Sequence, residues 1–119
     1  MTERGSASLL AVAVSVVVVV ASLVATDIAR MVDVRLKALA AADAAALAAA
    51  PLTIDGNPVA EATRFAQLNQ ARLVSCKCPV DPSPIVRWVT VVVEIPVDTW
   101  IIPARVVTAV ANAEFDPLA

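Results

Sequence analysis

SASLLAVAVSVVVVVASLVAT, residues 6–26, is an uncharged run near the start of the chain that contains neither glycine nor proline. At about 1.5 Å of rise per residue, a helix over this run is about 30 Å long, which matches the hydrocarbon core of a bilayer. The valines from Val16 to Val20 disfavour a helix in water but are well accepted in membrane helices. The run therefore predicts a transmembrane helix, Ser6–Thr26, behind a short polar leader, residues 1–5.

A secretory signal peptide is the main alternative for this run. Signal peptides have a shorter apolar core of about 7–15 residues, followed by a small-x-small cleavage site. Leu23-Val24-Ala25 is a poor match to such a site. Cleavage by signal peptidase stays open as an alternative.

The charges that flank the run give an ambiguous orientation. Arg4 precedes it, whereas Arg30, Arg35 and Lys37 follow it. The positive-inside rule taken alone places the rest of the chain in the cytoplasm. The two cysteines favour an oxidising compartment instead, so composition leaves the orientation open.

The segment Asp27–Ala50 reads as a water-facing continuation of the same helix. Alanine, the best helix former, dominates its second half, Ala42–Ala50, where small side chains would also allow another helix to approach closely. Larger apolar residues recur at a spacing of three to four and predict a stripe that faces a partner. The members of this stripe are Ile28, Val32, Leu36, Leu39 and Leu47.

Pro51 ends the helix, because the residue before a proline avoids the α region. The remainder, residues 51–119, predicts a small α+β head with one short helix and a three-stranded antiparallel sheet. The expected helix is Val59–Ala71, the expected strands are Leu73–Val80, Ile85–Ile95 and Arg105–Ala113, and the tail is expected to fray from Glu114. Such a head is too small to be stable alone and is expected to complete its core with the second half of the long helix.

The middle strand carries the clearest pattern in the head. One face of it is apolar and contains a single charged residue, Arg87. The apolar residues of that face are Ile85, Val89, Val91, Val93 and Ile95.

The residue types present argue against enzymatic chemistry. The chain has no histidine, so the commonest general base and metal ligand is missing, and we expect no catalytic residue, cofactor or metal site. Ser75 and Lys77 lie close together, but almost no glycine is present to build an oxyanion loop around them. A net charge of −2 with scattered basic residues also excludes a nucleic-acid partner.

Cys76 and Cys78 flank Lys77 and would share one face of a strand. Three alternatives stay open for them: a bond to each other, a bond to a partner chain, or two reduced thiols. Two soft ligands without a histidine are too few for a metal site.

Two segments together carry a resemblance to a known family. The first is Glu3-Arg4-Gly5-Ser6-Ala7-Ser8, the apolar run and the stretch ADAAALAAA, residues 42–50; the second is NQARLVSC, residues 69–76, followed by the strand Val89–Ile95. In this order they resemble the actinobacterial TadE-like proteins, pilin-like products encoded with the tight-adherence (Tad) pilus and secretion machinery. The resemblance implies a non-enzymatic bacterial protein of the cell membrane.

The resemblance also implies topology and partners. The N-terminus would be cytoplasmic and the pilin-like head extracytoplasmic, with the bilayer, other Tad assembly proteins and further copies of the chain as partners. The family typically pairs the cysteine of the ARLVSC strand with one near the start of the preceding helix, but residues 59–64 contain no cysteine. A membrane-anchored or secreted binding module unrelated to pili is the alternative function.

The leader matches the family only in part. Prepilin-type peptidases cut after a glycine at the cytoplasmic end of an apolar segment, and Gly5 before Ser6 fits that junction. Type IV pilins usually carry a glutamate five residues after the cut, where this chain has Leu10. The departure favours a minor or membrane-resident component over a major filament subunit.

Two surfaces are candidate partner contacts. One is the helix segment 39–50, with Leu39 and Leu47, although part of it must cover the head's own sheet. The other is the apolar tip of the loop 96–103, formed by Trp100, Ile101 and Ile102. Exposed tryptophan is enriched at binding hot spots, and the alternative is that this loop folds back on the sheet.

The first prediction concerns membrane insertion. The protein should stay with membranes through high-salt and carbonate washing and be released by detergent. Val18→Arg should impair insertion, because a charge at the centre of a membrane helix costs about 3 kcal/mol on insertion scales. Recovery of the unaltered protein in the soluble fraction would show that residues 6–26 do not span a membrane.

Overall fold

The protein was analysed as a computed structural model that describes residues 3–103 and 106–119. Met1 and Thr2 of the expected leader, and Arg105 at the start of the expected third strand, lie outside the described residues. The elements in chain order are α1 (Glu3–Ala49), the 3-10 turn η1 (Ala50–Thr53), α2 (Pro58–Leu68), β1 (Arg72–Lys77), β2 (Arg87–Pro96) and β3 (Val106–Phe115). The predicted α+β fold, a long N-terminal helix with a short helix and a three-stranded antiparallel sheet, is confirmed.

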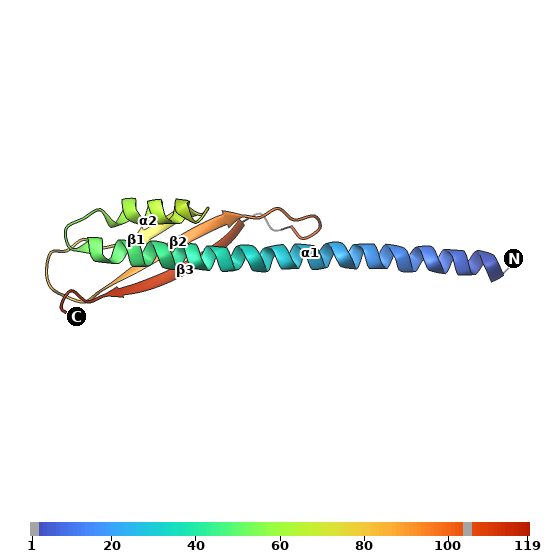
Figure 1. The fold of residues 1–119 in the computed structure, drawn as a ribbon, viewed down its shortest axis with the longest axis horizontal. Helices are drawn as coiled ribbons and strands as arrows, with labels where there is room; N and C mark the ends of the chain where they lie inside the picture. The colour runs from blue at the N-terminus through green and yellow to red at the C-terminus, as the bar shows by residue number, and fades with distance from the viewer. Residues whose placement is uncertain (1–2, 104–105) are drawn as a thin grey trace.

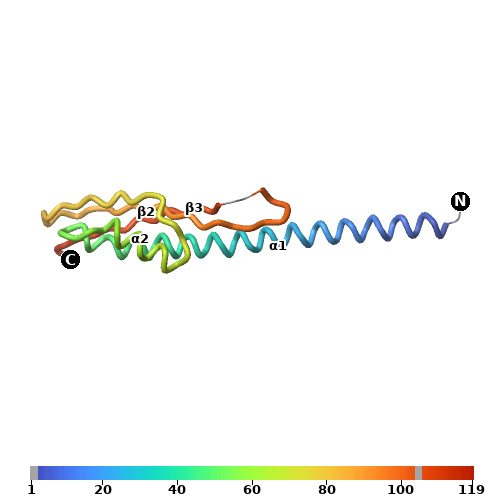
Figure 2. The backbone as a smooth tube through the Cα atoms, turned by 90° about the horizontal axis from the view of Figure 1, so that it is seen from above, coloured from blue at the N-terminus to red at the C-terminus, as the bar shows by residue number. Residues whose placement is uncertain are grey.

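The helix α1 runs along almost the whole length of the molecule, which measures 86 × 22 × 17 Å (Figure 1). Its first half is bare, and its second half carries the sheet and α2. Seen from above, the strands run alongside that second half, with the C-terminus at the end of the head far from the bare half (Figure 2). The head therefore has no core separate from the rod.

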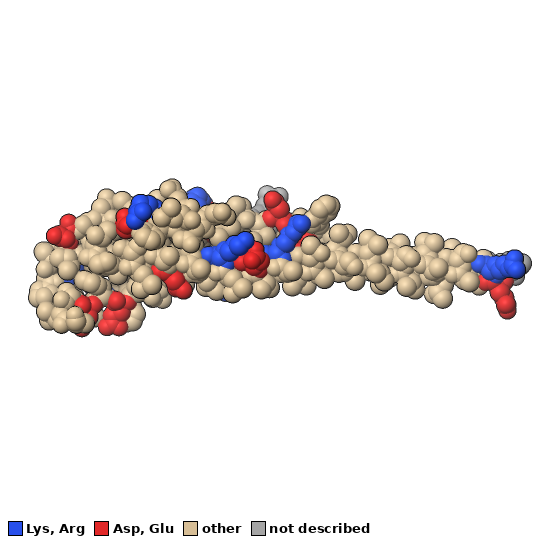
Figure 3. Space-filling view, in the orientation of Figure 1, with Lys and Arg blue, Asp and Glu red and all other residues tan. Residues whose placement is uncertain are grey.

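The bare half of α1 has the properties of a membrane helix. Every residue from 3 to 22 is exposed, and the helix is long and apolar enough to cross a bilayer. The hydroxyl groups of Ser15, Ser22 and Thr26 each donate a hydrogen bond to the carbonyl oxygen four residues earlier, at 2.8, 2.8 and 2.9 Å. The polar side chains of this segment are thus satisfied within the helix, as a lipid environment requires. Figure 3 shows a long stretch of this face without charge between the charged N-terminal end and the head.

The core lies between the second half of α1 and one face of the sheet. The fully buried side chains that the helix contributes are small, and six of them are at most 1% exposed: Ala38, Ala41, Ala42, Ala45, Ala46 and Ala49. Val34 and Leu39 pack against them at the edge of the core. The sheet contributes Val89, Val91 and Val93 of β2, with Ala109, Ala111 and Ala113 of β3 around them. Because alanines face the valines, the helix lies close to the strands without leaving space for larger side chains.

The sheet has the order β1-β2-β3, and both pairs are antiparallel. Val91 lies opposite Ala111 and Val93 opposite Ala109, which places the apolar sets of both strands on the helix side. On the other face Trp88 is 59% exposed, and Thr90 and Asn112 are hydrogen-bonded at 2.7 Å between their side-chain oxygens. The sheet therefore buries one face and leaves the other open.

Several predicted boundaries were wrong for local reasons. The helix α2 begins at Pro58, behind Asn57, whose side chain accepts a hydrogen bond from the Ala60 amide at 3.1 Å. It ends at Leu68 and not at Ala71, because Gln70 adopts a left-handed conformation with φ 59°. The Ala71 amide closes the end by donating to the Ala66 carbonyl at 2.9 Å.

The strand boundaries also differ from the prediction. Ile85 was expected in the core but is 54% exposed, because it lies in the turn before β2 begins at Arg87. The strand β1 ends at Lys77, shortly before Pro79, which has no amide hydrogen to donate to a neighbouring strand. The expected fraying from Glu114 was wrong, because β3 continues to Phe115, which pairs with Arg87.

The packing predicts a contrast between two alanines of the same helix. Ala45→Leu should lower the free energy of unfolding of the head by about 1–3 kcal/mol, because a larger side chain has no space against the sheet. Ala40→Leu, at an exposed position of α1, should change it by less than about 0.5 kcal/mol. Thermal unfolding of the full chain in detergent micelles measures both, and equal effects would contradict this description of the core.

Candidate interaction surfaces

The predicted apolar stripe lies on the outer side of α1. Ile28, Val32, Leu36 and Leu47 are 50%, 54%, 63% and 68% exposed. At about 100° per residue, their mean direction is about 125° from that of the buried alanines, and Ile28 and Val32 also line a groove with Ile102 and Val107 of the head. Leu39 differs from them, because it is half-buried and packs against the core. The helix thus buries its alanines against the head and presents larger apolar residues beside that contact.

The second predicted surface, the tip of the loop expected at residues 96–103, folds back on α1 and not on the sheet; the loop begins after Pro96, the last residue of β2, and runs over residues 97–103. Asp27 lies at the end of the apolar run and is fully buried. Its carboxylate accepts hydrogen bonds from three consecutive backbone amides, those of Trp100, Ile101 and Ile102, at 2.8, 2.6 and 3.0 Å. We call this segment the Trp100 loop. Figures 1 and 2 both show this loop beside α1, at the point where the bare N-terminal half of the helix meets the head.

Two of the three side chains at the tip are exposed, although the carboxylate of Asp27 holds their backbone. Trp100 is 70% exposed and Ile101 46% exposed, whereas Ile102 is half-buried. The Thr99 hydroxyl donates a hydrogen bond to the Ile102 carbonyl and closes the loop on itself. The loop therefore displays a tryptophan and an isoleucine on a fixed backbone.

The electrostatics of Asp27 favour its charged form. Burial raises the pKa of this carboxyl, but the three amide hydrogen bonds and the charge of Arg30 together bring it below its usual value. Arg30 also donates a hydrogen bond to the carbonyl oxygen of Asp98 at 3.5 Å. Sequence reasoning missed the role of Asp27, and the one available signal was a carboxylate placed directly after an apolar run.

A second polar cluster holds the far end of the head. The Arg87 guanidinium is buried on the apolar face of the sheet and donates hydrogen bonds to the carbonyl oxygens of Thr53, Asp81 and Ser83, the first at 2.8 Å. The Asp81 carboxylate accepts a hydrogen bond from the Ser83 amide at 2.8 Å. Hydrogen bonds from Ser83, against a smaller opposing effect of burial, lower the pKa of Asp81, and the Arg87 charge adds to this. Arg87, noticed in the sequence as the one charge on its face, therefore ties the turn before β2 to η1.

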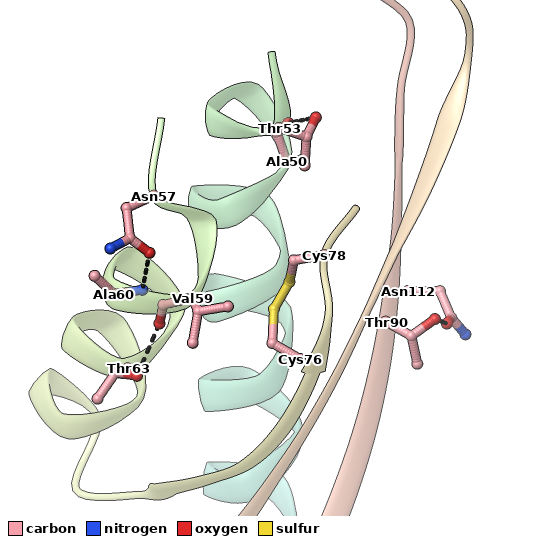
Figure 4. The surroundings of a disulfide bond; sticks show 10 residues. All are labelled: Ala50, Thr53, Asn57, Val59, Ala60, Thr63, Cys76, Cys78, Thr90 and Asn112. Carbon is pink, nitrogen blue, oxygen red and sulfur yellow. Dashed lines mark hydrogen bonds between the residues drawn. A yellow bond between two sulfur atoms is a disulfide. The ribbon is translucent and has the colours of Figure 1, made fainter. Parts of the chain in front are cut away.

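The cysteines lie where β1 meets the helices. Figure 4 shows a disulfide between Cys76 and Cys78, the first of the three alternatives left open by the sequence. Both residues are half-buried and pack against the core. Ser75 and Lys77 are exposed on either side of Cys76. In the part of the chain that the structure describes, no three histidine, cysteine or acidic residues gather as a metal site would need.

The expected leader junction continues the helix. Gly5 and Ser6 are exposed in the first turns of α1, and the Ser6 hydroxyl donates to the Glu3 carbonyl at 2.9 Å. Leu10 is 67% exposed one turn further on. These residues lie at the end of the molecule opposite to the head.

Comparison with known proteins gives one result. Residues 5–51 match the model of a family described as putative Flp pilus-assembly TadE/G-like. The match covers the helical rod, less than half of the chain, and leaves out the strand segments 69–76 and 89–95 that also contributed to the sequence resemblance. The description names pilus assembly and no reaction. Neither a search of curated proteins nor a search of solved structures found a match.

The rod of this chain is therefore similar to the TadE/G-like family, which confirms that part of the resemblance. An actinobacterial origin is not part of this result. The head, which carries the sheet and the Trp100 loop, contributes nothing to the match.

The Asp27 contacts lead to a prediction about the Trp100 loop. Asp27→Asn should accelerate hydrogen exchange of the amides of residues 100–102 by about tenfold, because a neutral amide oxygen is a weaker acceptor than a carboxylate. Asp33→Asn is the matched control, since Asp33 is exposed and pairs with Lys37. Hydrogen exchange is measured by mass spectrometry on the full chain in micelles. If both variants exchanged at the rate of the unaltered protein, Asp27 would not be the group that holds the loop.

The same contacts set the direction of the pH dependence. Because the pKa of Asp27 is lower in the folded chain than in the unfolded chain, its carboxylate stabilises the loop fully at neutral pH. This contribution is lost as the pH falls through the lowered pKa. Protection of the three amides, corrected for the intrinsic exchange rate, should therefore persist at mildly acidic pH and disappear in stronger acid.

Proposed function

We propose that this chain is a non-enzymatic component of a Tad-type or type IV-like pilus or secretion assembly, anchored in the cell membrane by a single helix. The observation that carries the proposal is the match of the rod to the TadE/G-like family. The apolar run that precedes the head supports it, because it is long enough to span a bilayer. The outward apolar stripe supports it as well, since a rod that acts by packing needs such a surface.

The proposed topology places the N-terminus in the cytoplasm and the head outside the cell membrane. The family resemblance supports this orientation, although the count of flanking basic residues alone favours the reverse. The disulfide between Cys76 and Cys78 also supports it, because disulfides persist in oxidising compartments. The chain is then divided into a leader (1–5), a membrane span (6–26), an extracytoplasmic continuation of the helix (27–50) and a head (51–119).

We assign the chain a minor or membrane-resident role and not that of a major filament subunit. In type IV pilins, a glutamate near the N-terminus can neutralise the terminal amine of a neighbouring subunit within the apolar filament core. Leu10 occupies that position here and has no charge to offer. Gly5 and Ser6 still form a junction at which a prepilin peptidase could remove the leader.

The stripe on α1 is the surface proposed to contact other assembly proteins or further copies of this chain. Ile28, Val32 and Leu36 are exposed and continue the apolar surface of the span beyond the bilayer, along the edge of the head. Leu47 extends the same side toward the end of the rod. Apolar residues at a spacing of four form the kind of ridge that packs into the groove of another helix.

A membrane-anchored or secreted binding module unrelated to pili is the second candidate. The observation that favours it is that the family match ends at residue 51, before α2 and the sheet. In that case the head would bind its own partner, and the rod would serve only as an anchor.

Cross-linking in the native membrane distinguishes the two candidates. A photo-activatable phenylalanine at Leu36 should form cross-links to pilus-assembly proteins or to a second copy, identified by mass spectrometry. The same residue at Leu68 is the matched control, because Leu68 is similarly exposed, at 65% against 63%, but lies on α2 of the head. Cross-links that form at Leu68 and not at Leu36 would contradict the assembly role of the rod and favour the binding module.

A further inference from the structure

The Trp100 loop lies where the apolar run of α1 ends, and this position suggests a function. We propose that the loop is an interfacial anchor, which inserts Trp100 and Ile101 into the boundary between the headgroups and acyl chains of the outer leaflet. The head would then be held against the bilayer at a second point besides the helix. This inference rests on the proposed single-pass topology with the head outside the membrane.

The first argument is the depth at which the loop is held. Asp27 binds the loop amides and directly follows Thr26, the last residue of the apolar run. One turn earlier, Leu23 and Val24 are half-buried, although residues 6–22 are all exposed. The Trp100 loop is the segment that lies beside the helix at this point in both views (Figures 1 and 2). The tip therefore lies at the level where the span leaves the hydrocarbon.

The second argument is that the backbone of the loop is prepared for an apolar environment. An amide without a partner is costly in lipid, so irregular backbone is excluded there unless its polar groups are satisfied. The amides of Trp100, Ile101 and Ile102 all donate to Asp27. The Ile102 carbonyl accepts from the Thr99 hydroxyl. The tip can thus approach the acyl chains without exposing these groups.

The third argument is the chemistry of the exposed side chains. Tryptophan is enriched at membrane–water interfaces, where its ring meets the acyl chains and its N–H stays near water. Trp100 is 70% exposed, a large apolar surface for a side chain whose backbone is held so firmly. Ile101 stands beside it and adds a purely apolar contact.

An apolar groove continues this surface along the rod. It has a volume of about 410 Å³ and begins at Ile28, one residue after Asp27. Its lining combines one side of the helix with the loop and β3: Ile28, Met31, Val32, Arg35, Ile102 and Val107. Ile28 and Val32 belong to the stripe on α1, so the groove connects this stripe with the Trp100 loop.

The nearest basic residue to the end of the span is Arg30, and the loop carries one exposed acidic residue, Asp98. Arg30 follows Asp27 by three residues, or about 4.5 Å along the helix axis, which is within the headgroup layer of about 5–8 Å on each side of the hydrocarbon. Its exposed guanidinium is close enough to the bilayer to meet a phosphate while it contacts the Asp98 carbonyl. We therefore assign the tip of the loop, Trp100 and Ile101, to phospholipid and not to a protein partner, because it lies where the apolar run of α1 ends.

The chain contains its own control for this proposal. Trp88 is 59% exposed on the open face of the sheet, near the start of β2. The strand runs from there to Pro96, next to the loop, over about 26 Å at about 3.3 Å per residue. The two tryptophans therefore have similar exposure but should lie at very different distances from the bilayer.

The experiment uses the full chain in phosphatidylcholine–phosphatidylglycerol vesicles, with one tryptophan removed at a time. Trp88→Phe leaves Trp100 as the fluorophore, and Trp100→Phe leaves Trp88. Lipids brominated on the upper part of the acyl chain should quench Trp100 several-fold more strongly than Trp88. Acrylamide in the water should show the reverse order. Adding Asp27→Asn to the Trp88→Phe chain should weaken quenching by the lipids.

Each other outcome has a definite meaning. If Trp100 is quenched by acrylamide as strongly as Trp88 and the brominated lipids do not affect it, the loop is not an anchor. If neither quencher reaches Trp100, and cross-linking shows a second copy over it, the surface binds protein and the proposal is overturned. Flotation of the vesicles tests the underlying topology separately, because a chain that does not float with them lacks the span itself. If cross-linking contradicted the assembly role of the rod, the fluorescence result would still decide whether the Trp100 loop is a membrane anchor.

Discussion

The structure depends on one constraint: a single continuous helix has to satisfy two solvents. In its first half the helix exposes apolar side chains on every side, which is stable in lipid and not in water. In its second half it buries a narrow side of alanines against the sheet. The head could not form a core without that side, because three strands and α2 leave one apolar face uncovered. The head therefore packs along residues 27–50 of the helix, directly beyond the end of the span.

Much of this arrangement can be predicted from the sequence, because it arises from local patterns. The length of the run at residues 6–26 predicts the span, and the alternation from Val89 to Ile95 predicts the buried face of β2. Boundaries were less predictable where a single residue decided them. The left-handed Gln70 ended α2 early, and pairing with Arg87 kept Phe115 in β3. Neither effect has a signal within a short window of sequence.

The polar contacts at the two ends of the head were the least predictable part. Asp27 acts on amides more than seventy residues later in the chain, so its role appears only when the loop and the helix are seen together. Arg87 had a visible signal, a lone charge on an apolar face, but its carbonyl partners lie in η1 and in the turn at residues 81–83. The family match shares this limit: it covers the rod, whose sequence pattern is regular, and stops before the parts that distinguish this chain.

The two sides of α1 have a consequence for how folding and assembly relate. The alanines that stabilise the head and the apolar stripe of Ile28, Val32 and Leu36 project from the same helix in directions about 110° apart. A neighbour that packs on the stripe displaces nothing from the core, so the chain does not have to open in order to bind. Substitutions in the stripe can alter which neighbours it accepts while the head keeps its stability. Evolution can therefore change the specificity of such a rod and the architecture of its head independently of each other.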